Sequence, residues 1–259
     1  MVALKLLELA ESGEVDGLLK LIHGGLSPDL RDGYGRTALM LAAREGHEHV
    51  VRALLQAGAH VGAADEEGDT VLMRAAMEGR KAVVRLLLRA RPDTEARDRY
   101  GFTALIRASM NGHTEVMELL LASGAAVDAS DRNGRTPLIW AALRDHLGAV
   151  QLLVEKGAFV DARGERNSTA LMEAAFRGHA EVVDLLLARG ADIDAVDTGG
   201  FTALALALRR RHPATAKLLL AHGAETNTVD HFGRTPLMWA RSAGMNEVVD
   251  TLLAAAPTR

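Results

Sequence analysis

Apolar residues recur along this chain with a strict period of 33 residues. Seven leucines stand in register, and an alanine follows each of them three residues later: Leu39, Leu72, Leu105, Leu138, Leu171, Leu204 and Leu237, with Ala42, Ala75, Ala108, Ala141, Ala174, Ala207 and Ala240. A spacing of three places the two residues on one helical face. A second leucine series lies 15 residues after the first and follows apolar pairs such as Val50-Val51: Leu54, Leu87, Leu120, Leu153, Leu186, Leu219 and Leu252. Each period therefore predicts two short amphipathic helices.

Polar residues, glycine and proline mark the ends of these helices. A threonine precedes each leucine of the first series by two residues, at Thr37, Thr70, Thr103, Thr136, Thr169, Thr202 and Thr235. Its hydroxyl can cap a helix, and Pro137 and Pro236 then occupy the first helical position. Glycines such as Gly46 and Gly58 are typical of the left-handed residue that ends a helix. An Asp-x-x-Gly turn, as in Asp32 to Gly35, links successive units.

A single two-helix unit cannot bury its own apolar face, but stacked units can form a continuous core. The pattern therefore predicts an all-α solenoid of eight stacked helix-turn-helix units of 33 residues, with short β-turn or hairpin tips. Small alanines let the first helices approach closely, while larger leucines and valines hold the second helices apart. We expect the first-helix side to be concave.

Two segments carry a family resemblance: DRNGRTPLIWAALRDHLGAVQLLVEKGAFVDA and DHFGRTPLMWARSAGMNEVVDTLL. They resemble the ankyrin repeat, whose pattern is D-x-x-G-x-T-P-L-H-x-A-A-x-x-G-H followed by a second helix, and the resemblance extends from Asp32 to the C-terminus. Residues 1–31 keep the register but lack the Thr-x-Leu start. We therefore expect an N-terminal capping repeat at 1–31, six ankyrin repeats at 32–229 and a C-terminal capping repeat at 230–259. The resemblance implies a non-catalytic protein-protein interaction module.

The chain departs from the family pattern at several places. The histidine after the leucine is replaced by Met40, Met73, Ile106, Ile139, Met172, Ala205 and Met238. We expect apolar packing to substitute for the hydrogen bonds that this histidine makes in similar proteins. Arg91-Pro92 replaces Gly-Ala after a second helix, and positive φ costs arginine more than glycine, which predicts a weak junction. Gly164 and Asn167 replace the Asp and Gly of the fifth turn.

The amino-acid composition argues against several classes of function. The net charge of −4 lacks the basic excess that is typical of nucleic-acid binding. The absence of cysteine excludes disulfides and thiolate chemistry. The sequence has neither a signal-peptide pattern nor an apolar run long enough to span a bilayer. We expect no membrane association and a cytoplasmic location, and the Arg-rich, Cys-free composition favours a bacterial source.

Histidines could suggest a metal or a catalytic site. Five of them fall at one repeat position, at His47, His113, His146, His179 and His212. In a stack they would lie about 10 Å apart, the spacing of packed helices, and could not share one metal ion. The chain also has no Walker-type phosphate loop, no Gly-x-Ser-x-Gly motif and no cysteine nucleophile. We expect no catalytic, cofactor-binding or metal-binding residues and no cofactor.

Aromatic residues are rare, at 3% of the chain, and eight of the nine fall at tips or on first helices. These eight are Tyr34, Tyr100, Phe102, Phe176, Phe201, Phe232, Trp140 and Trp239. We expect the core to be aliphatic and these rings to face the concave side or its rim, where Trp, Tyr and Arg often dominate binding. The alternative is that some of them pack between neighbouring repeats.

Arginine greatly outnumbers lysine, 25 to 5, and many arginines stand at tips or on first helices, including Arg74, Arg209 and Arg210. Arginine suits bidentate recognition of carboxylates and stacking on aromatic rings. The alternative is a bias of genome composition. The predicted partner-binding residues are Arg99, Tyr100, Phe102, Arg107, Arg132, Arg135, Trp140, Arg144, Arg166, Phe176 and Arg177 in the middle of the chain, and Phe232, Arg234 and Trp239 in the last unit.

The leading hypothesis is therefore a module that binds a partner protein or peptide across the concave face, with an acidic partner surface favoured and a scaffold, inhibitor or immunity-type role. One alternative is binding of nucleic acid or another polyanion through the arginine row. Another is an enzyme. The sequence does not name the partner, and polar ends favour a monomer.

Overall fold

The structure is a computed structural model that describes residues 2–254. Over this range the chain is all-helical, with 16 α-helices and one 3₁₀ turn. Strand-like pairing in the described range is limited to isolated bridges, such as Arg31 with Thr37. The chain divides into two compact units, residues 1–132 and 133–259. The all-α prediction is thus confirmed.

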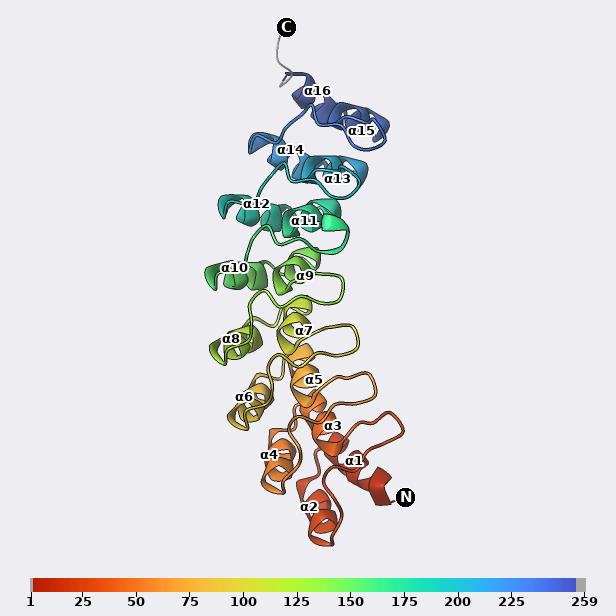
Figure 1. Ribbon diagram of the computed structural model, residues 1–259, viewed down its shortest axis with the longest axis vertical. Coiled ribbons are helices and arrows are strands. Elements are labelled where there is room, and N and C mark those ends of the chain that lie inside the picture. The colour runs from red at the N-terminus through yellow and green to blue at the C-terminus, as the bar shows by residue number, and fades with distance from the viewer. Residues whose placement is uncertain (1, 255–259) are drawn as a thin grey trace. The chain divides into compact units, whose positions relative to one another are not determined.

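The first unit holds four helix pairs. Its helices are α1 (Val2–Ser12), α2 (Val15–His23), α3 (Ala38–Glu45), α4 (Glu48–Gln56), α5 (Val71–Met77), α6 (Lys81–Arg89), α7 (Ala104–Met110) and α8 (Thr114–Ala122). The odd-numbered helices α1, α3, α5 and α7 pack in one row, and α2, α4, α6 and α8 pack in a second row beside it (Figure 1). Each pair therefore buries its apolar side against the next pair.

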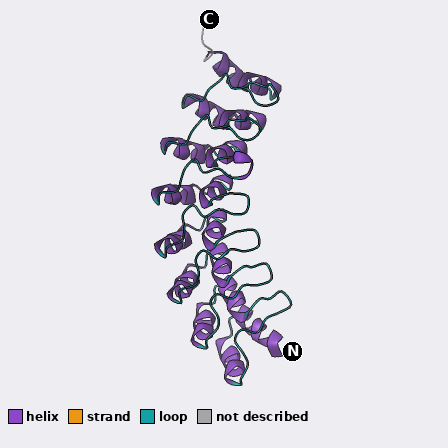
Figure 2. Ribbon diagram, in the orientation of Figure 1, coloured by secondary structure: helices purple, strands orange, loops and turns teal. Residues whose placement is uncertain are grey.

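The second unit repeats this arrangement. Its helices are α9 (Pro137–Leu143), α10 (Leu147–Glu155), the 3₁₀ turn η1 (Glu165–Asn167), α11 (Ala170–Arg177), α12 (Ala180–Ala188), α13 (Ala203–Arg209), α14 (Pro213–Ala221), α15 (Pro236–Ser242) and α16 (Asn246–Ala254). The row α9, α11, α13 and α15 packs beside the row α10, α12, α14 and α16. Within each unit the tips project as loops beside the odd-numbered helices (Figure 2).

The predicted threonine caps are present at all seven first helices of the repeats. Each Thr has an extended backbone. Its hydroxyl oxygen accepts a hydrogen bond from the N–H of the third residue after it, at 3.3–3.4 Å, as between Thr37 and Met40 or between Thr202 and Ala205. A cap of this kind stabilises a helix by about 1 kcal/mol. The caps set the direction in which each tip enters its helix, and therefore where the side chains of the tip lie.

Apolar packing occupies the position that histidine holds in the family pattern. Met40, Met73, Ile106, Ile139, Met172 and Ala205 are all buried. Met238 is 53% exposed, because it lies on α15, the last helix of its row in the described chain. The expected substitution of packing for hydrogen bonds is thus confirmed at the first six positions and wrong at Met238.

Helix ends adopt the left-handed backbone conformation that the glycines predict. Gly46 and Gly58, for example, have φ of 90° and 85°. Arg91 and Arg211 adopt the same conformation, with φ of 54° and 62°, where other repeats have glycine. The left-handed conformation costs a non-glycine residue about 1–2 kcal/mol. Both junctions therefore carry the backbone strain that was expected at Arg91.

Candidate protein-binding surface

The tips are held in place by their first aspartate and by one another. Asp98 Oδ1 accepts the N–H groups of Tyr100 at 2.8 Å and Phe102 at 2.9 Å. Backbone hydrogen bonds then join successive tips, such as Arg132 N–H to the Tyr100 carbonyl at 3.0 Å. Gly101 is required at this contact, because a Cβ there would lie 2.8 Å from the Arg132 nitrogen. The tips are therefore ordered platforms for side chains.

Three tip aromatics are well exposed, as predicted: Tyr34, Tyr100 and Phe232. Arg99 lies 4.9 Å from the centre of the Tyr100 ring, donates to its hydroxyl at 2.8 Å and forms an ion pair with Glu67. Phe102 is half-buried beside Tyr100, with ring centres 6.0 Å apart. Arg99 and Tyr100, two of the predicted partner-binding residues, thus form an exposed pair in the first unit.

Arg107, predicted to contact a partner, lies instead in an ionic network of the first unit. It binds Asp69 at 3.0 Å and also Asp98, and its guanidinium lies 4.6 Å from the centre of the Phe102 ring. Arg74 binds Asp65 at 2.7 Å and Asp69 at 3.0 Å. The Arg107 side chain is only 16% exposed, so most of its binding capacity is used inside the chain.

Burial shapes the electrostatics of this network. Desolvation raises the pKa of Asp69 above its ordinary value, although the guanidinium groups of Arg107 and Arg74 partly offset this effect. Asp69 belongs to one repeat and Arg107 to the next, so the network joins two tips. The sequence could not reveal this role, because the interaction depends on which carboxylate oxygens remain free in the folded tips.

Two aromatic rings lie in the core, and the expectation of a wholly aliphatic core is wrong for them. Phe201 is 1% exposed and Trp140 is 8% exposed. Phe201 packs on Phe232 and Trp239 of the next repeat, with ring centres 6.0 and 6.1 Å away. Phe201 directly follows the tip glycine Gly200 and turns inward between two repeats, whereas Trp140 lies on α9. Packing between repeats therefore accounts for the burial of Phe201.

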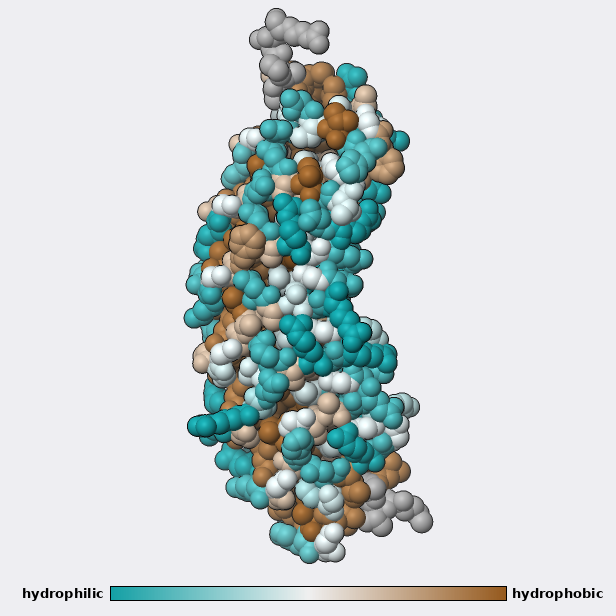
Figure 3. Space-filling view, in the orientation of Figure 1, coloured by the Kyte–Doolittle hydropathy of each residue, from teal (hydrophilic) through white to brown (hydrophobic). Residues whose placement is uncertain are grey.

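Exposed arginines in the second unit stack on aromatic rings. Arg210 lies 4.5 Å and Arg177 lies 5.9 Å from the centre of the Phe176 ring. Arg234 lies 4.5 Å and Arg209 lies 6.0 Å from the Trp239 ring. We call this set the Arg–aromatic surface; it comprises Phe176, Arg177, Arg209, Arg210, Arg234 and Trp239. In the space-filling view, strongly hydrophilic side chains cover much of the edge along which the tips lie (Figure 3).

Arg209 and Arg210 were absent from the predicted site. They stand 33 residues after Phe176 and Arg177, so they occupy the same two repeat positions. Comparing neighbouring repeats at each position would have found them. Among residues 2–254, Arg177, Arg209 and Arg210 form no ion pair with a carboxylate within 4.0 Å.

The remaining predicted residues have different environments. Arg132, Arg144 and Arg166 are exposed. Arg135 is paired with Glu165 at 2.6 Å and lies 5.1 Å from the centre of the Trp140 ring. Arg99, Tyr100, Phe102, Arg107 and Arg132 belong to residues 1–132, and the other nine predicted residues belong to the second unit.

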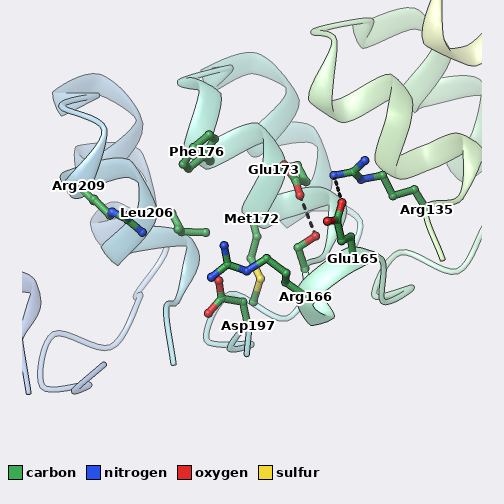
Figure 4. Close-up of a pocket in the computed structure, with 10 residues that line it drawn as sticks. Arg135, Glu165, Arg166, Met172, Glu173, Phe176, Asp197, Leu206 and Arg209 are labelled. Carbon is green, nitrogen blue, oxygen red and sulfur yellow. Dashed lines mark hydrogen bonds and ion pairs between the residues drawn. The ribbon is translucent and has the colours of Figure 1, made fainter. Parts of the chain in front are cut away.

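A pocket of about 180 Å³ opens at the fifth tip, where the turn departs from Asp-x-x-Gly (Figure 4). Arg166 and Asn167 both have positive φ there, at 57° and 63°. Ten residues line the pocket: Arg135, Glu165, Arg166, Ser168, Met172, Glu173, Phe176, Asp197, Leu206 and Arg209. The Ser168 hydroxyl donates to Glu173 at 2.8 Å, and Arg135 is paired with Glu165. Charged groups of both signs thus surround an apolar floor.

Four histidines form hydrogen bonds between neighbouring repeats. Nε2–H groups donate to backbone carbonyls 36 residues earlier, from His47 to Glu11, His113 to Met77, His179 to Leu143 and His212 to Phe176, at 2.9–3.3 Å. These bonds satisfy carbonyls at the ends of first helices, which supports the structural interpretation of this position. In the described part of the chain no group of three His, Cys, Asp or Glu side chains could hold a metal ion. No helix between residues 2 and 254 is long and apolar enough to cross a bilayer.

Comparison with known proteins agrees with this architecture. A family model described as ankyrin repeats, in three copies, matches residues 6–98, 90–164 and 171–258. The chain belongs to the ankyrin repeat family. The crystal structure of the human ASB11 ankyrin repeat domain is similar to it, with a TM-score of 0.78 and 31% identity over 85% of this chain and 98% of that chain. A search of curated proteins found no match. Ankyrin repeat domains are generally protein-interaction modules and are typically non-catalytic.

Proposed function

We propose that this ankyrin repeat chain is a non-catalytic module that binds an acidic surface or segment of a partner protein through the Arg–aromatic surface. The observation that carries the proposal is the stacking of exposed arginines on Phe176 and Trp239, with Arg177, Arg209 and Arg210 lacking a carboxylate partner in the described chain. Binding would act as a scaffold, an inhibitor or an immunity-type neutraliser.

Stacking favours recognition of carboxylates. A guanidinium on a ring face keeps its N–H groups in its own plane, where they remain available for a bidentate bond. The ring also restricts the arginine rotamers, so less side-chain entropy is lost when the partner binds. Arginine and aromatic residues are the side chains most often found at the energetic centre of interfaces.

Binding of nucleic acid or another polyanion is the second candidate, since the same free arginines would contact phosphates. The net charge of −4 disfavours it, because polyanion binding draws on a general basic excess. The salt dependence of binding affinity distinguishes the two candidate functions. Affinity for a polyanion falls steeply with salt, while an interface that also buries aromatic rings loses much less.

The test is affinity capture from an extract of the native cells with three baits. They are the wild-type chain, the variant Arg177→Ala/Arg209→Ala/Arg210→Ala, and the control Arg52→Ala/Arg85→Ala/Arg89→Ala. The control removes the same charge from exposed positions on α4 and α6. A protein retained by the wild type and the control, lost by the first variant and then bound directly in purified form supports the proposal. Equal retention by all three baits would contradict it.

A further inference from the structure

Four of the aspartates that open the tips, Asp32, Asp65, Asp98 and Asp230, use both carboxylate oxygens within their own repeat. Oδ1 accepts backbone N–H groups of the turn, as Asp230 does from Phe232 at 2.8 Å and Arg234 at 3.0 Å. Oδ2 then accepts from a side chain four or nine residues later: Arg36 to Asp32 at 2.7 Å, Arg74 to Asp65 at 2.7 Å, Arg107 to Asp98, and Trp239 to Asp230 at 2.8 Å. The repeat therefore has a fixed place for one N–H donor.

Asp197 lacks this donor. Its Oδ1 holds the sixth tip by accepting the N–H groups of Gly199 at 2.7 Å and Phe201 at 2.9 Å. The residues four and nine positions later are Phe201 and Leu206, and neither side chain can donate a hydrogen bond. Within residues 2–254 no donor to the second oxygen of Asp197 is found.

The preceding repeat has changed at the same position. Glu173 stands where Arg74 and Arg107 stand in the first unit, nine residues after the start of its tip, and Gly164 replaces the aspartate itself. Two neighbouring repeats thus lack the internal arginine, and both present a carboxylate. The pocket of about 180 Å³ lies at this place, between α11 and α13 (Figure 4).

We propose that this pocket receives a basic side chain of a partner protein, an arginine or a lysine, whose cationic group donates to Asp197 Oδ2 and to Glu173. The chain itself indicates this chemistry, because Arg74 and Arg107 place a guanidinium on the corresponding oxygen of their own tips. Met172 and Leu206 supply apolar surface for the aliphatic stem, as they line the same pocket. The proposal rests on the proposed function only in assigning the side chain to a protein partner.

The charges around the pocket are compatible with a cation. Arg135 is neutralised by Glu165, and Arg209 lies over the Phe201 ring at 5.0 Å. Arg166 reaches toward Asp197 from the preceding tip but forms no ion pair with it in the described chain (Figure 4). The lining holds three arginines, Arg135, Arg166 and Arg209, and three carboxylates, Glu165, Glu173 and Asp197, so no net positive charge opposes the entry of a cation. Arg166 is the internal competitor for the site, and the test therefore includes a variant of it.

The first measurement is an NMR titration of the full-length, ¹⁵N-labelled chain with acetyl-arginine amide. We expect saturable shifts of the Gly199 and Phe201 amides, because both N–H groups bind Asp197. Acetyl-citrulline amide, a neutral isostere, and acetyl-glutamate amide should leave these signals in place. Asp197→Asn should weaken the arginine probe about tenfold, the loss expected for one charge-assisted hydrogen bond. The asparagine oxygen still accepts the two amides, so the tip remains folded.

The second measurement uses a variant of the chain whose own side chain occupies the pocket. Leu206→Arg restores the donor that Arg74 provides, and we expect it to raise the melting temperature and abolish probe binding, while Leu206→Met leaves both unchanged. Equal shifts from the glutamate probe, unaltered probe binding by Leu206→Arg, or binding only after Arg166→Asn would each overturn the proposal. None of these results alters the capture experiment on Arg177, Arg209 and Arg210, so the two proposals fail separately.

Discussion

Arg107 donates to Asp69 at 3.0 Å, and these two residues belong to successive repeats. The same guanidinium binds Asp98 of its own tip, and Asp69 also binds Arg74. Three aspartates and two arginines therefore form one chain of alternating charge along the tips of the first unit. Such a chain is costly to interrupt, because removing one member takes a counter-charge away from each of its buried neighbours.

Arg107→Ala should therefore lower the free energy of unfolding by about 3 kcal/mol, since it leaves the buried Asp98 without its ion-pair partner and leaves Asp69 with Arg74 alone. Urea denaturation followed by circular dichroism measures this loss. Arg85→Ala, which removes an exposed arginine on α6, is the control and should stay within about 0.5 kcal/mol of the wild type. Similar small effects of both substitutions would show that the network does not stabilise the fold.

Asp230 predicts a dependence of stability on pH. Burial acts to raise its pKa, but hydrogen bonds from Arg234 N–H, the Trp239 indole and Phe232 N–H outweigh it and hold the pKa below the ordinary value of 3.8. A carboxyl whose pKa is lowered on folding stabilises the folded state above its ordinary pKa, and this stability is lost as pH falls through the lowered value.

The stability difference between the wild type and Asp230→Asn should accordingly be constant between pH 5 and pH 7 and shrink as the pH falls below about 4. Urea titrations at a series of pH values give this difference. Asp250→Asn, on α16, is the control for a general loss of charge. A difference that grows on acidification would contradict the predicted sign.

The fold was largely predictable from the sequence, because the signals that determine it are local. The 33-residue period, the threonine caps and the helix-ending glycines each act within one repeat, so a single unit of sequence contains the information. Tyr34, Tyr100 and Phe232 were also correctly predicted to be exposed, because tip residues have few neighbours.

Side-chain roles at variable positions were harder to predict. The position nine residues after the start of a tip varies between repeats, and Arg74, Arg107, Leu206 and Trp239 are four of its seven occupants. The first two and Trp239 donate to their tip aspartates, while Leu206 leaves one without a donor. These roles follow from the place of a single carboxylate oxygen, which the repeat pattern does not encode. The burial of Phe201 likewise depends on the direction in which its tip turns.

The strained junctions offer a route to a more stable chain. Arg211 has φ of 62° at a place where most repeats have glycine. Arg211→Gly should remove about 1 kcal/mol of left-handed strain, part of which is offset by the greater freedom of glycine in the unfolded chain. Thermal denaturation should show a higher melting temperature. The matched control, Arg85→Gly inside α6, should lower it.

Conservative substitutions on the Arg–aromatic surface separate the two candidate functions. The triple variant Arg177→Lys/Arg209→Lys/Arg210→Lys keeps every charge but loses the planar, bidentate and stacking properties of arginine. If the surface binds carboxylates of a partner protein, affinity for the captured partner should fall at least about tenfold, the cost of a lost bidentate contact. If the surface binds a polyanion through charge alone, the lysine variant should elute from heparin at nearly the same salt concentration as the wild type. Retention of full partner affinity by the lysine variant would remove the stacking argument, because charge would then be sufficient.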